Sequence, residues 1–585
     1  MKSFKYRILA LSAVTLLTAC TRQADDRSNT FRGVLKDDVK TLDPANSYDS
    51  VSLDVLPMIY ETLYQYDYLA DTYKVVPLLA ADLPRFSADR LTLTIPIKHG
   101  VKFQDDPAFK ATGGKGRELK AQDFVFAFKR LADPIIQSQG WWIFDGKIKG
   151  INEFHDKLTK ATAAEQKKVF AEPVEGVRAL DDYTLQIKMA QPYPQILYVL
   201  AMPFTSPVAS EAIEVHGDEK GNLTDHPVGT GPYTLTTWEH GHQITLDRNP
   251  THHAEFFPAG ASPDAGKLLP FADRLSFQII KEAQPAWLGF LQGNTDIAAI
   301  PKDNFNNAID KDGNLTPELK TKNVTLNIEK AVSFYYVGFN VKDATLANRF
   351  LRQALSSAVD RAAWIEIFTN NRGRKMVNAL PEGILDRAST DKIKYDLNLD
   401  RARELLKKAG YEGGKGLPVL NFDMRGADSV SRQMGDFFAQ QFARIGVKVN
   451  VIYNTFPAYL EKAKVGNLQM SYGGWSMDYP DAENVFQLLY GPNKAPGPNE
   501  SNYENPEMDK LYKQISVMES GPKRAVLVQK MDDLLQEDCP WGLGYYHAEY
   551  KLTQPWLSNY RGKEIILNKF KYFRIDQSIR NQRKK

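Results

Sequence analysis

The chain has 585 residues, with 43% hydrophobic and 25% charged residues. This length predicts about three or four domains, and the composition excludes global disorder and a multi-span membrane protein. The formal net charge is +3, but Lys2, Lys5 and Arg7 account for all of it. The rest of the chain is balanced, so no nucleic-acid partner is expected, because a phosphate backbone is bound by a basic face.

The N-terminus has the pattern of a bacterial export signal. A basic start is followed by an apolar run at 8–17, which is too short to span a bilayer of about 30 Å. The sequence Leu-Thr-Ala-Cys then ends at Cys20 and resembles a lipobox, whose cysteine is lipidated after cleavage. We therefore expect a signal peptide at 1–19, a flexible lipidated tether at 20–30, and a bacterial envelope protein held at a membrane in a periplasmic or extracytoplasmic location. The alternative is an ordinary secretory signal with an incidental cysteine.

The first half of the chain alternates strand and helix patterns. Residues 91–98 and 183–188 alternate apolar and polar side chains, which predicts half-exposed strands. A helix is predicted between Lys120 and Pro134, because Phe124, Phe128 and Leu131 recur at helical spacing. These patterns indicate an α/β chain.

Further strands follow towards the middle of the chain. Residues 229–248 predict a hairpin with its turn at 239–241, and residues 274–280 predict another strand. An aromatic strand is expected at 332–340, followed by a helix with apolar side chains from Leu346 onwards.

The stretch 418–480 predicts a β-α-β-α-β unit. Strands are expected at 418–424, 447–453 and 468–472, with helices at 431–445 and 457–465 between them. Such a unit predicts a parallel sheet with right-handed crossovers.

Ligands of open parallel sheets bind outside the carboxyl ends of the strands. Three loops of the 418–480 unit lie there, at 425–428, 454–456 and 473–479. This edge is the candidate binding site before any family is considered.

The sequence gives little support for an enzyme or a metal-binding protein. No G-x-S-x-G or H-E-x-x-H occurs, so an enzyme has no positive support. His240, His242, His252 and His253 lie close in sequence, but no cysteine or H-x-x-x-H spacing accompanies them. We expect them on hairpin and loop surface, and we expect no metal site and no cofactor. Cys539 is expected to be a small buried residue.

A series of short runs resembles the extracellular solute-binding proteins of family 5, the oligopeptide- and dipeptide-binding components of ABC importers. The runs cover most of the chain beyond the signal and occur in the order of that family. They are TLDPA at 41–45, VPLLAAD at 76–82, LTIPIKHGVKF at 93–103, KAQDFVF at 120–126, VGTGPYTL at 228–235, YVGFN at 336–340, RQALSSAVDR at 352–361, WSMDYPD at 475–481 and NYENPEMDK at 502–510.

The resemblance implies a two-lobed α/β periplasmic-binding-protein-like fold of type II, cluster C, with three domains, mixed sheets and a hinge. The expected domain I is discontinuous, domain II is inserted into it, and domain III forms the second lobe. The ranges are 31–64, 204–283 and 543–585 for domain I, 65–203 for domain II and 284–542 for domain III. The hinge is expected near 281–284 and 540–542, where Gly542 adds backbone freedom.

The resemblance also implies residues of the binding site. In peptide-binding members, the Asp after the cleft Trp pairs with the α-ammonium group of the ligand, and the matching residues here are Asp478 and Trp475. An acceptor-only carboxylate complements an ammonium group with three donors. Phe456 matches a cleft aromatic position, and Asn454 lies in the same loop.

One departure concerns the ligand carboxylate. Some oligopeptide binders have an Arg just before the Gly-Gly-Trp, where this chain has Tyr472. Arg425 or Arg432 could substitute, since both lie on or just after the first loop of the same edge.

The sequence therefore predicts a lipid-anchored, monomeric peptide receptor that partners an ABC permease and its ATPases. Within the same fold, the alternative is a non-peptide ligand such as a metal chelate, haem or a small glycan. A secreted hydrolase and a sensory binding protein without transport are the alternatives from other classes.

Overall fold

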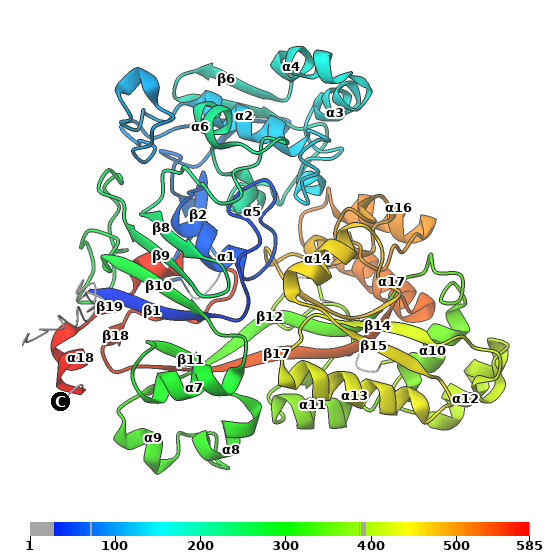
Figure 1. Ribbon diagram of the computed structural model, residues 1–585. Helices are drawn as coiled ribbons and strands as arrows, with labels where there is room; N and C mark the ends of the chain where they lie inside the picture. Colours follow the sequence, from blue (N-terminus) through cyan, green and yellow to red (C-terminus); the bar gives the residue numbers. More distant parts are fainter. Residues whose placement is uncertain (1–28, 71–72, 385, 388–392, 584–585) are drawn as a thin grey trace, which may run out of the picture.

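The computed structural model describes residues 29–70, 73–384, 386–387 and 393–583. Cys20 and the expected signal and tether up to residue 28 lie outside these residues. Two four-stranded sheets lie on one side of the molecule and a seven-stranded sheet on the other (Figure 1). We call these two parts lobe I and lobe II.

The base of lobe I is a four-stranded sheet in the order β1-β10-β9-β8. Its strands are β1 (Thr30–Leu35), β8 (Tyr233–Glu239), β9 (Gln243–Arg248) and β10 (Arg274–Ile279). β1 pairs parallel to β10, while β10 with β9 and β9 with β8 are antiparallel. The hairpin predicted at 229–248 and the strand at 274–280 are confirmed.

The upper part of lobe I is an antiparallel sheet in the order β4-β5-β7-β6, covered by helices (Figure 1). Its strands are β4 (Arg85–Phe86), β5 (Thr92–Pro96), β6 (Val177–Asp181) and β7 (Thr184–Lys188). The main helices are α2 (Ala121–Leu131), α3 (Ile151–Lys160) and α4 (Ala163–Ala171). Phe124, Phe128 and Leu131 of α2 are buried, as their helical spacing predicted.

Lobe II is built on a sheet in the order β11-β17-β12-β16-β14-β15, with β13 paired to β17. Its strands are β11 (Ile297–Ala299), β12 (Thr325–Phe339), β13 (Arg374–Lys375), β14 (Leu420–Met424), β15 (Val449–Tyr453), β16 (Met470–Ser476) and β17 (Trp541–Thr553). β14 pairs parallel with both β15 and β16, whereas β16, β12, β17 and β11 pair antiparallel.

The predicted β-α-β-α-β unit is confirmed within one or two residues for its helices. α13 (Ser429–Ala443) connects β14 to β15, and α14 (Phe456–Lys464) connects β15 to β16. The Asp428 side chain caps α13 by accepting the backbone N–H groups of Val430 and Ser431 at 2.9 and 3.0 Å. Because β14, β15 and β16 run parallel, the loops that follow them meet at one edge of the sheet.

The two longest strands, β12 and β17, extend across the base of the molecule (Figure 1). Their register shifts between Lys330 and Phe334 and again between Tyr335 and Tyr336 of β12, and the first shift is the wider interruption. The ladder therefore has two segments: residues 325–330 of β12 pair with 548–553 of β17, and residues 334–338 pair with 541–546. The first segment also carries β11, which contacts β1 of lobe I, and the second is joined to β16.

This arrangement differs from the expected hinge at 540–542. Gly542 lies at the start of β17, buried and paired with Val337, and the strand continues to Thr553. The predicted domain boundary between residues 542 and 543 therefore falls inside one strand. The glycine suggested a flexible crossing, but sheet pairing fixes its backbone.

Helices cover both faces of the lobe II sheet (Figure 1). The remaining helices are α1 (Ser52–Val55), α5 (Ile196–Val199) and α6 (Ser210–His216) in lobe I, α7 (Ala283–Leu291), α8 (Phe305–Ala308) and α9 (Pro317–Thr321) beside β11, and α10 (Arg349–Ala358), α11 (Arg361–Thr369), α12 (Leu399–Lys408), α15 (Ala482–Phe486), α16 (Pro506–Ile515), α17 (Pro522–Asp538) and the terminal α18 (Gln577–Arg583). Short strand pairs are β2 (Tyr64–Tyr66) with β3 (Val75–Pro77), and β18 (Leu557–Ser558) with β19 (Arg574–Ile575).

Several hydrophobic cores hold the molecule together, as its length predicted. One lies within lobe I and another between the lobe II sheet and α10–α13. A further core combines lobe I aromatics such as Tyr68 and Tyr572 with Phe334 and Tyr336 of β12, so apolar packing joins the two lobes. Cys539 is 2% exposed, as predicted, and burial raises the pKa of its thiol to about 11. Within the described residues, no helix combines the length and the apolar character needed to cross a membrane.

Candidate ligand-binding site

The candidate site lies where the carboxyl ends of β14, β15 and β16 face lobe I. Asp478 follows β16 directly and is partly buried between the lobes. Its Oδ2 accepts a hydrogen bond from the Tyr48 hydroxyl of lobe I at 2.8 Å. The same oxygen accepts a second bond from the Asn484 side-chain amide at 2.7 Å. Asp478 is therefore held by both lobes through one of its two oxygens.

Asn484 of α15 positions both predicted site residues in this loop. Its Oδ1 accepts the backbone N–H of Asp478 at 2.9 Å and the indole N–H of Trp475 at 3.3 Å. Asn484 is fully buried, so these bonds replace the water that its amide group would otherwise bind. The end of β16 and the loop after it are thus held in place by one amide, which bonds both Trp475 and Asp478.

Aromatic rings enclose the carboxylate of Asp478. The Tyr48 ring meets Trp475 edge-on at 5.5 Å between centroids and contacts Phe204 at 4.8 Å. Tyr66 is also close: its hydroxyl is buried without a hydrogen-bond partner in the described structure, and the Asp478 charge is among the causes that raise its pKa. The site combines one carboxylate with apolar walls, an arrangement typical of small-molecule sites.

The surroundings of Asp478 oppose its ionised form. Burial raises the pKa of Asp478 to about 7, while the bonds from Asn484 and Tyr48 act in the opposite direction. Within the described ranges, no Lys, Arg or His nitrogen lies within 4.0 Å of this carboxylate. A cation from outside the chain would therefore find an acceptor that no protein cation occupies.

Two acidic neighbours of Asp478 have protein partners. Glu483 accepts the ammonium group of Lys147 in lobe I at 3.1 Å, and the hydroxyls of Tyr479 and Tyr512 also bond to it. The Lys147 charge helps to hold the pKa of Glu483 below its ordinary value, against the effect of burial.

Asp481 is shared between the lobes in a similar way. It pairs with Arg524 at 2.5 Å and accepts the Gln195 amide of lobe I at 3.2 Å. These ties hold the lobes together beside the free acceptor of Asp478.

Phe456 and Arg425 lie together at the adjoining strand ends. The backbone N–H of Phe456 donates to Asp37 of lobe I at 3.0 Å. The Arg425 guanidinium lies 5.3 Å from the Phe456 ring centre and 5.5 Å from that of Tyr459, and its Nη1 donates to the Gly474 carbonyl at 2.8 Å. No carboxylate lies within 4.0 Å of Arg425 in the part of the chain that the structure describes.

The other predicted site residues have different surroundings. Tyr472 and Trp475 point to opposite faces of β16, because side chains alternate along a strand. Tyr472 stacks on Tyr335 with centroids 5.5 Å apart, and its hydroxyl lies 3.3 Å from that of Tyr545. The predicted grouping of Tyr472 with Trp475 thus ignored this alternation.

Asn454 and Arg432 contact neither Asp478 nor Trp475 through any bond in the described structure. The Asn454 amide donates to Asp423 at 2.9 Å and to the Met424 carbonyl at 3.1 Å, so it ties two strand ends together. Arg432 is exposed on α13, with its guanidinium 5.0 Å from the Tyr453 ring centre.

The sequence did not identify Tyr48, Asn484 or Lys147. Tyr48 is 430 residues from Asp478, and Lys147 is 336 residues from Glu483. Only closure of the two lobes brings these partners together. Asn484 is nearer in the chain, but no local pattern distinguishes it from an ordinary helical asparagine.

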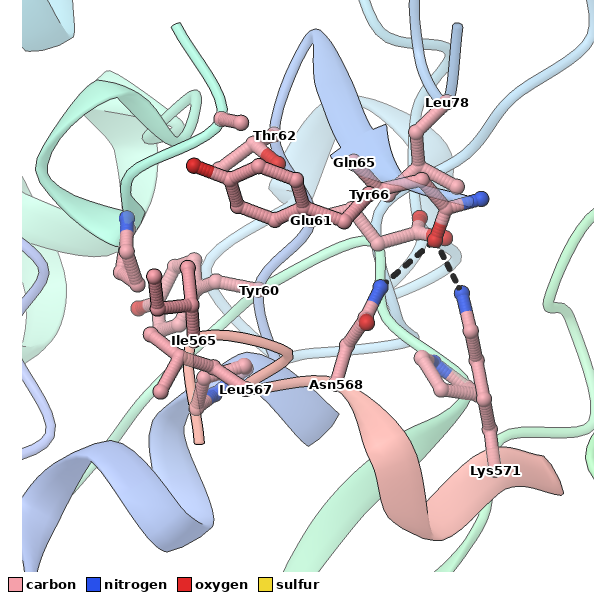
Figure 2. A pocket seen from close by; sticks show the side chains of 14 residues that line it. Tyr60, Glu61, Thr62, Gln65, Tyr66, Leu78, Ile565, Leu567, Asn568 and Lys571 are labelled. Atoms are coloured by element: carbon pink, nitrogen blue, oxygen red, sulfur yellow. Dashed lines mark hydrogen bonds between the residues drawn. The ribbon is translucent and has the colours of Figure 1, made fainter. Parts of the chain in front are cut away.

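A small cavity lies elsewhere in lobe I, beside Glu61, Gln65 and Lys571 (Figure 2). Its volume of about 30 Å³ holds one or two water molecules and is too small for a peptide. Gln65 accepts hydrogen bonds there from Asn568 at 2.6 Å and from Lys571 at 2.9 Å (Figure 2).

The four histidines considered as metal ligands in the sequence lie in two separate pairs. His240 and His242 are exposed on the hairpin turn, as expected. His252 and His253, expected on loop surface, instead direct their side chains onto buried Glu61. No sequence pattern near Glu61 predicted its contact with these two histidines.

Comparison with known proteins places the chain in a family. The family model described as "Bacterial extracellular solute-binding proteins, family 5 Middle" matches residues 74–497. Heme-binding protein A of Haemophilus influenzae is 27% identical over 465 residues, which cover 78% of this chain and 76% of that protein. Di/tripeptide-binding protein 1 of Pseudomonas aeruginosa is 26% identical over 502 residues, covering 85% of each. The oligopeptide-binding protein OppA of Bacillus subtilis is 24% identical over 541 residues, covering 91% of this chain and 89% of that protein.

Solved structures share the fold. DppA from Helicobacter pylori in complex with the peptide STSA superposes with a TM-score of 0.74 at 22% identity, covering 93% of this chain and 97% of that one. Haemophilus influenzae OppA in complex with RPPGFSPFR gives a TM-score of 0.76 at 18% identity, with 94% and 99% covered. The expected fold class, a type II periplasmic-binding-protein-like α/β fold, is confirmed. The chain belongs to the bacterial extracellular solute-binding proteins of family 5.

Proposed function

We propose that this chain captures peptides between its two lobes and delivers them to a membrane permease with its ATPases. The observation that carries the proposal is Asp478, a carboxylate enclosed between the lobes with no protein cation within 4.0 Å in the described residues. Such a group is the complement of a peptide α-ammonium, which has three donors and a positive charge. Relatives described as di/tripeptide- and oligopeptide-binding proteins support the same ligand class.

The hydrogen bonds of Asp478 indicate where the ammonium group would bind. Tyr48 and Asn484 both donate to Oδ2, which leaves Oδ1 as the acceptor for a ligand. Trp475 and Tyr48 form the walls beside it. Because Asp478 is partly buried between these walls, the attraction between the two charges is stronger than it would be at an exposed position.

Arg425 supplies the opposite charge at the same sheet edge. Its guanidinium has a backbone carbonyl and two aromatic rings as neighbours, so its positive charge has no carboxylate within ion-pair distance among the described residues. The carboxylate with the largest electrostatic influence on Arg425 is that of the partly buried Glu500, which attracts it without an ion-pair contact. We infer that Arg425 binds a carboxylate of the ligand, because this chain has Tyr472 at the position where some oligopeptide binders have an Arg for that role. Arg432, exposed on α13, is not used in this proposal.

The parts of the proposal that concern membrane attachment, location and assembly rest on the sequence. Cys20 is the lipid attachment site, the mature chain is an extracytoplasmic monomer, and the protein binds its ligand without turning it over. The three-domain division is retained, except that the crossing from lobe II to lobe I at the C-terminal side is placed after Thr553, where β17 ends.

A haem ligand is the second candidate, because Heme-binding protein A is among the relatives. Native mass spectrometry of the protein, purified from its own envelope without refolding, separates the two. Peptide masses that dissociate on activation support the peptide proposal. A haem mass with a Soret absorption band, and no bound peptide after incubation with an equimolar tripeptide and tetrapeptide library, would overturn it.

A further inference from the structure

Glu61, His252 and His253 converge in lobe I, outside the contacts that surround Asp478. Glu61 lies between the short helix η1 (Leu56–Met58) and β2, and the two histidines follow β9. Oε1 of Glu61 is 3.1 Å from Nε2 of His252 and 3.0 Å from Nε2 of His253. The three side chains are only 2%, 4% and 9% exposed, respectively.

The geometry of these donors suits a metal ion as well as a hydrogen-bonded cluster. Two imidazole nitrogens and one carboxylate oxygen are a donor set that zinc uses when it keeps a fourth position open. Zinc bonds such atoms at about 2.0–2.2 Å, which in a tetrahedron separates neighbouring donors by about 3.3 Å. The two measured oxygen–nitrogen separations are close to that edge length, and all three donor atoms lie within 4.8 Å of one another.

Neighbouring side chains fix the orientation of the Glu61 carboxylate. The Thr230 hydroxyl donates to Oε2 of Glu61 at 3.0 Å and so orients the carboxylate; Nε2 of His253 lies 3.2 Å from the same oxygen, in addition to its 3.0 Å approach to Oε1. Carboxylates that ligate metals are commonly oriented by a hydrogen bond of this kind. In the described structure no Lys or Arg nitrogen lies within 4.0 Å of Glu61, because Lys571 pairs instead with Glu255 at 2.7 and 2.9 Å.

A second His–carboxylate cluster provides an internal comparison. Asp106 bonds His216 through Oδ1 at 2.7 Å and His226 through Oδ2 at 2.9 Å. The two imidazole rings stack at 3.6 Å instead of converging on one oxygen, and the His226 side chain is 49% exposed. This arrangement fits two separate ion pairs better than one metal centre.

We propose that Glu61, His252 and His253 form a binding site for a divalent ion of the zinc class. Glu61 also lines the small cavity beside Gln65 and Lys571 (Figure 2), but the proposal rests on the three donor atoms alone. The ion joins the segment before β2 to the loop after β9, two parts of lobe I that are 191 residues apart at Glu61 and His252. It therefore stabilises lobe I without occupying the peptide site.

The proposal is tested on the full-length chain, first stripped with a chelator. Titration with Zn²⁺ by calorimetry is expected to show one ion per chain, and Co²⁺ is expected to give the visible absorption of a tetrahedral site. X-ray absorption of the zinc-loaded wild type is expected to show two imidazole ligands and oxygen. This last measurement needs no variant, so it stands even if a substitution at the buried cluster prevents folding.

Variants then assign the site. His253→Asn is expected to weaken Zn²⁺ binding by at least about tenfold and to abolish the rise in melting temperature that zinc causes in the wild type. His242→Asn, which removes an exposed histidine of the hairpin, is the matched control and is expected to bind zinc like the wild type. Absence of stoichiometric zinc binding would overturn the proposal. So would loss of binding in His226→Asn but not in His253→Asn, since that would place the ion at Asp106.

Discussion

Replacing Asp478 by Asn is expected to stabilise the ligand-free chain and to weaken peptide binding. An Asn side chain has the shape of Asp, and its amide oxygen can accept the bonds that Tyr48 and Asn484 donate to Oδ2. The substitution therefore removes the charge and leaves the walls of the site in place.

The magnitude follows from the pKa of Asp478, which burial raises to about 7 from its ordinary value of 3.8. At 1.36 kcal/mol per unit, the ionised carboxylate costs the folded state about 4 kcal/mol, and screening at a partly exposed group lowers this to about 2–4 kcal/mol. Because the folded pKa lies above the unfolded one, this cost is absent below about pH 4, grows as pH rises, and is complete above about pH 7. Asp478→Asn should raise the melting temperature of the ligand-free protein at pH 8 and leave it unchanged near pH 4.

Peptide binding is expected to change in the opposite sense. Loss of one partner of a buried charge pair typically costs about 2–5 kcal/mol, or about 30- to 5,000-fold in affinity. Calorimetry at pH 8 with a tetrapeptide recovered as natural cargo, and with its N-acetylated form, measures this. The wild type should prefer the free amine strongly, and Asp478→Asn should bind both forms equally weakly.

Asp428→Asn is the matched control for the charge change. It makes the same substitution at the same sheet edge, and Asn is as good an N-cap for α13 as Asp. Its peptide affinity should equal that of the wild type. If the wild type binds free and acetylated peptides equally, or if both variants lose affinity alike, Asp478 does not recognise the ammonium group.

Three further predictions concern the neighbours of this carboxylate and the membrane anchor. Tyr48→Phe removes a 2.8 Å bond that lowers the pKa of Asp478, so the pH below which peptide affinity falls should move upwards from about 7, and an unchanged pH profile would contradict the role of Tyr48. Lys147→Met breaks the buried pair with Glu483 between the lobes, a loss of about 3–5 kcal/mol, so small-angle scattering of the ligand-free chain should show a larger radius of gyration than the wild type. Equal radii for the two proteins would show that this pair does not favour closure. Cys20→Ser should leave the protein uncleaved or released from the membrane, and recovery of a processed, acylated membrane protein would refute the lipobox assignment.

The sequence predicted those parts of the molecule that short-range patterns determine. The 418–480 unit was predicted because each of its strands and helices is determined by a pattern of fewer than 20 residues. The edge that carries Asp478 and Trp475 followed from the parallel order of three strands, and the resemblance then named the two residues. Tyr472 was predicted at the same site, whereas alternation along the strand places its side chain on the opposite face of β16 from that of Trp475.

The parts that were not predicted depend on contacts between distant segments. Tyr48 reaches Asp478, and Glu61 reaches His252, only after segments 430 and 191 residues apart have packed together. Gly542 shows the reverse problem: a residue with a flexible backbone was taken as a hinge, but its neighbours in the sheet hold it in a strand. Local sequence shows which backbone conformations a residue can adopt. The contacts that restrict it to one of them are made by residues distant in the sequence.

The interruption in the β12–β17 ladder has a consequence for how affinity can evolve. It separates the segment attached through β11 to lobe I from the segment attached to β16 and the ligand site. If the lobes rotate about this point, residues 331–333 influence the resting angle between them. The apparent dissociation constant equals the intrinsic one divided by the fraction of molecules in the competent conformation. Substitutions at the interruption would then multiply the affinities for all peptides by one common factor, so binding strength could be adjusted while the order of preference among peptides is conserved.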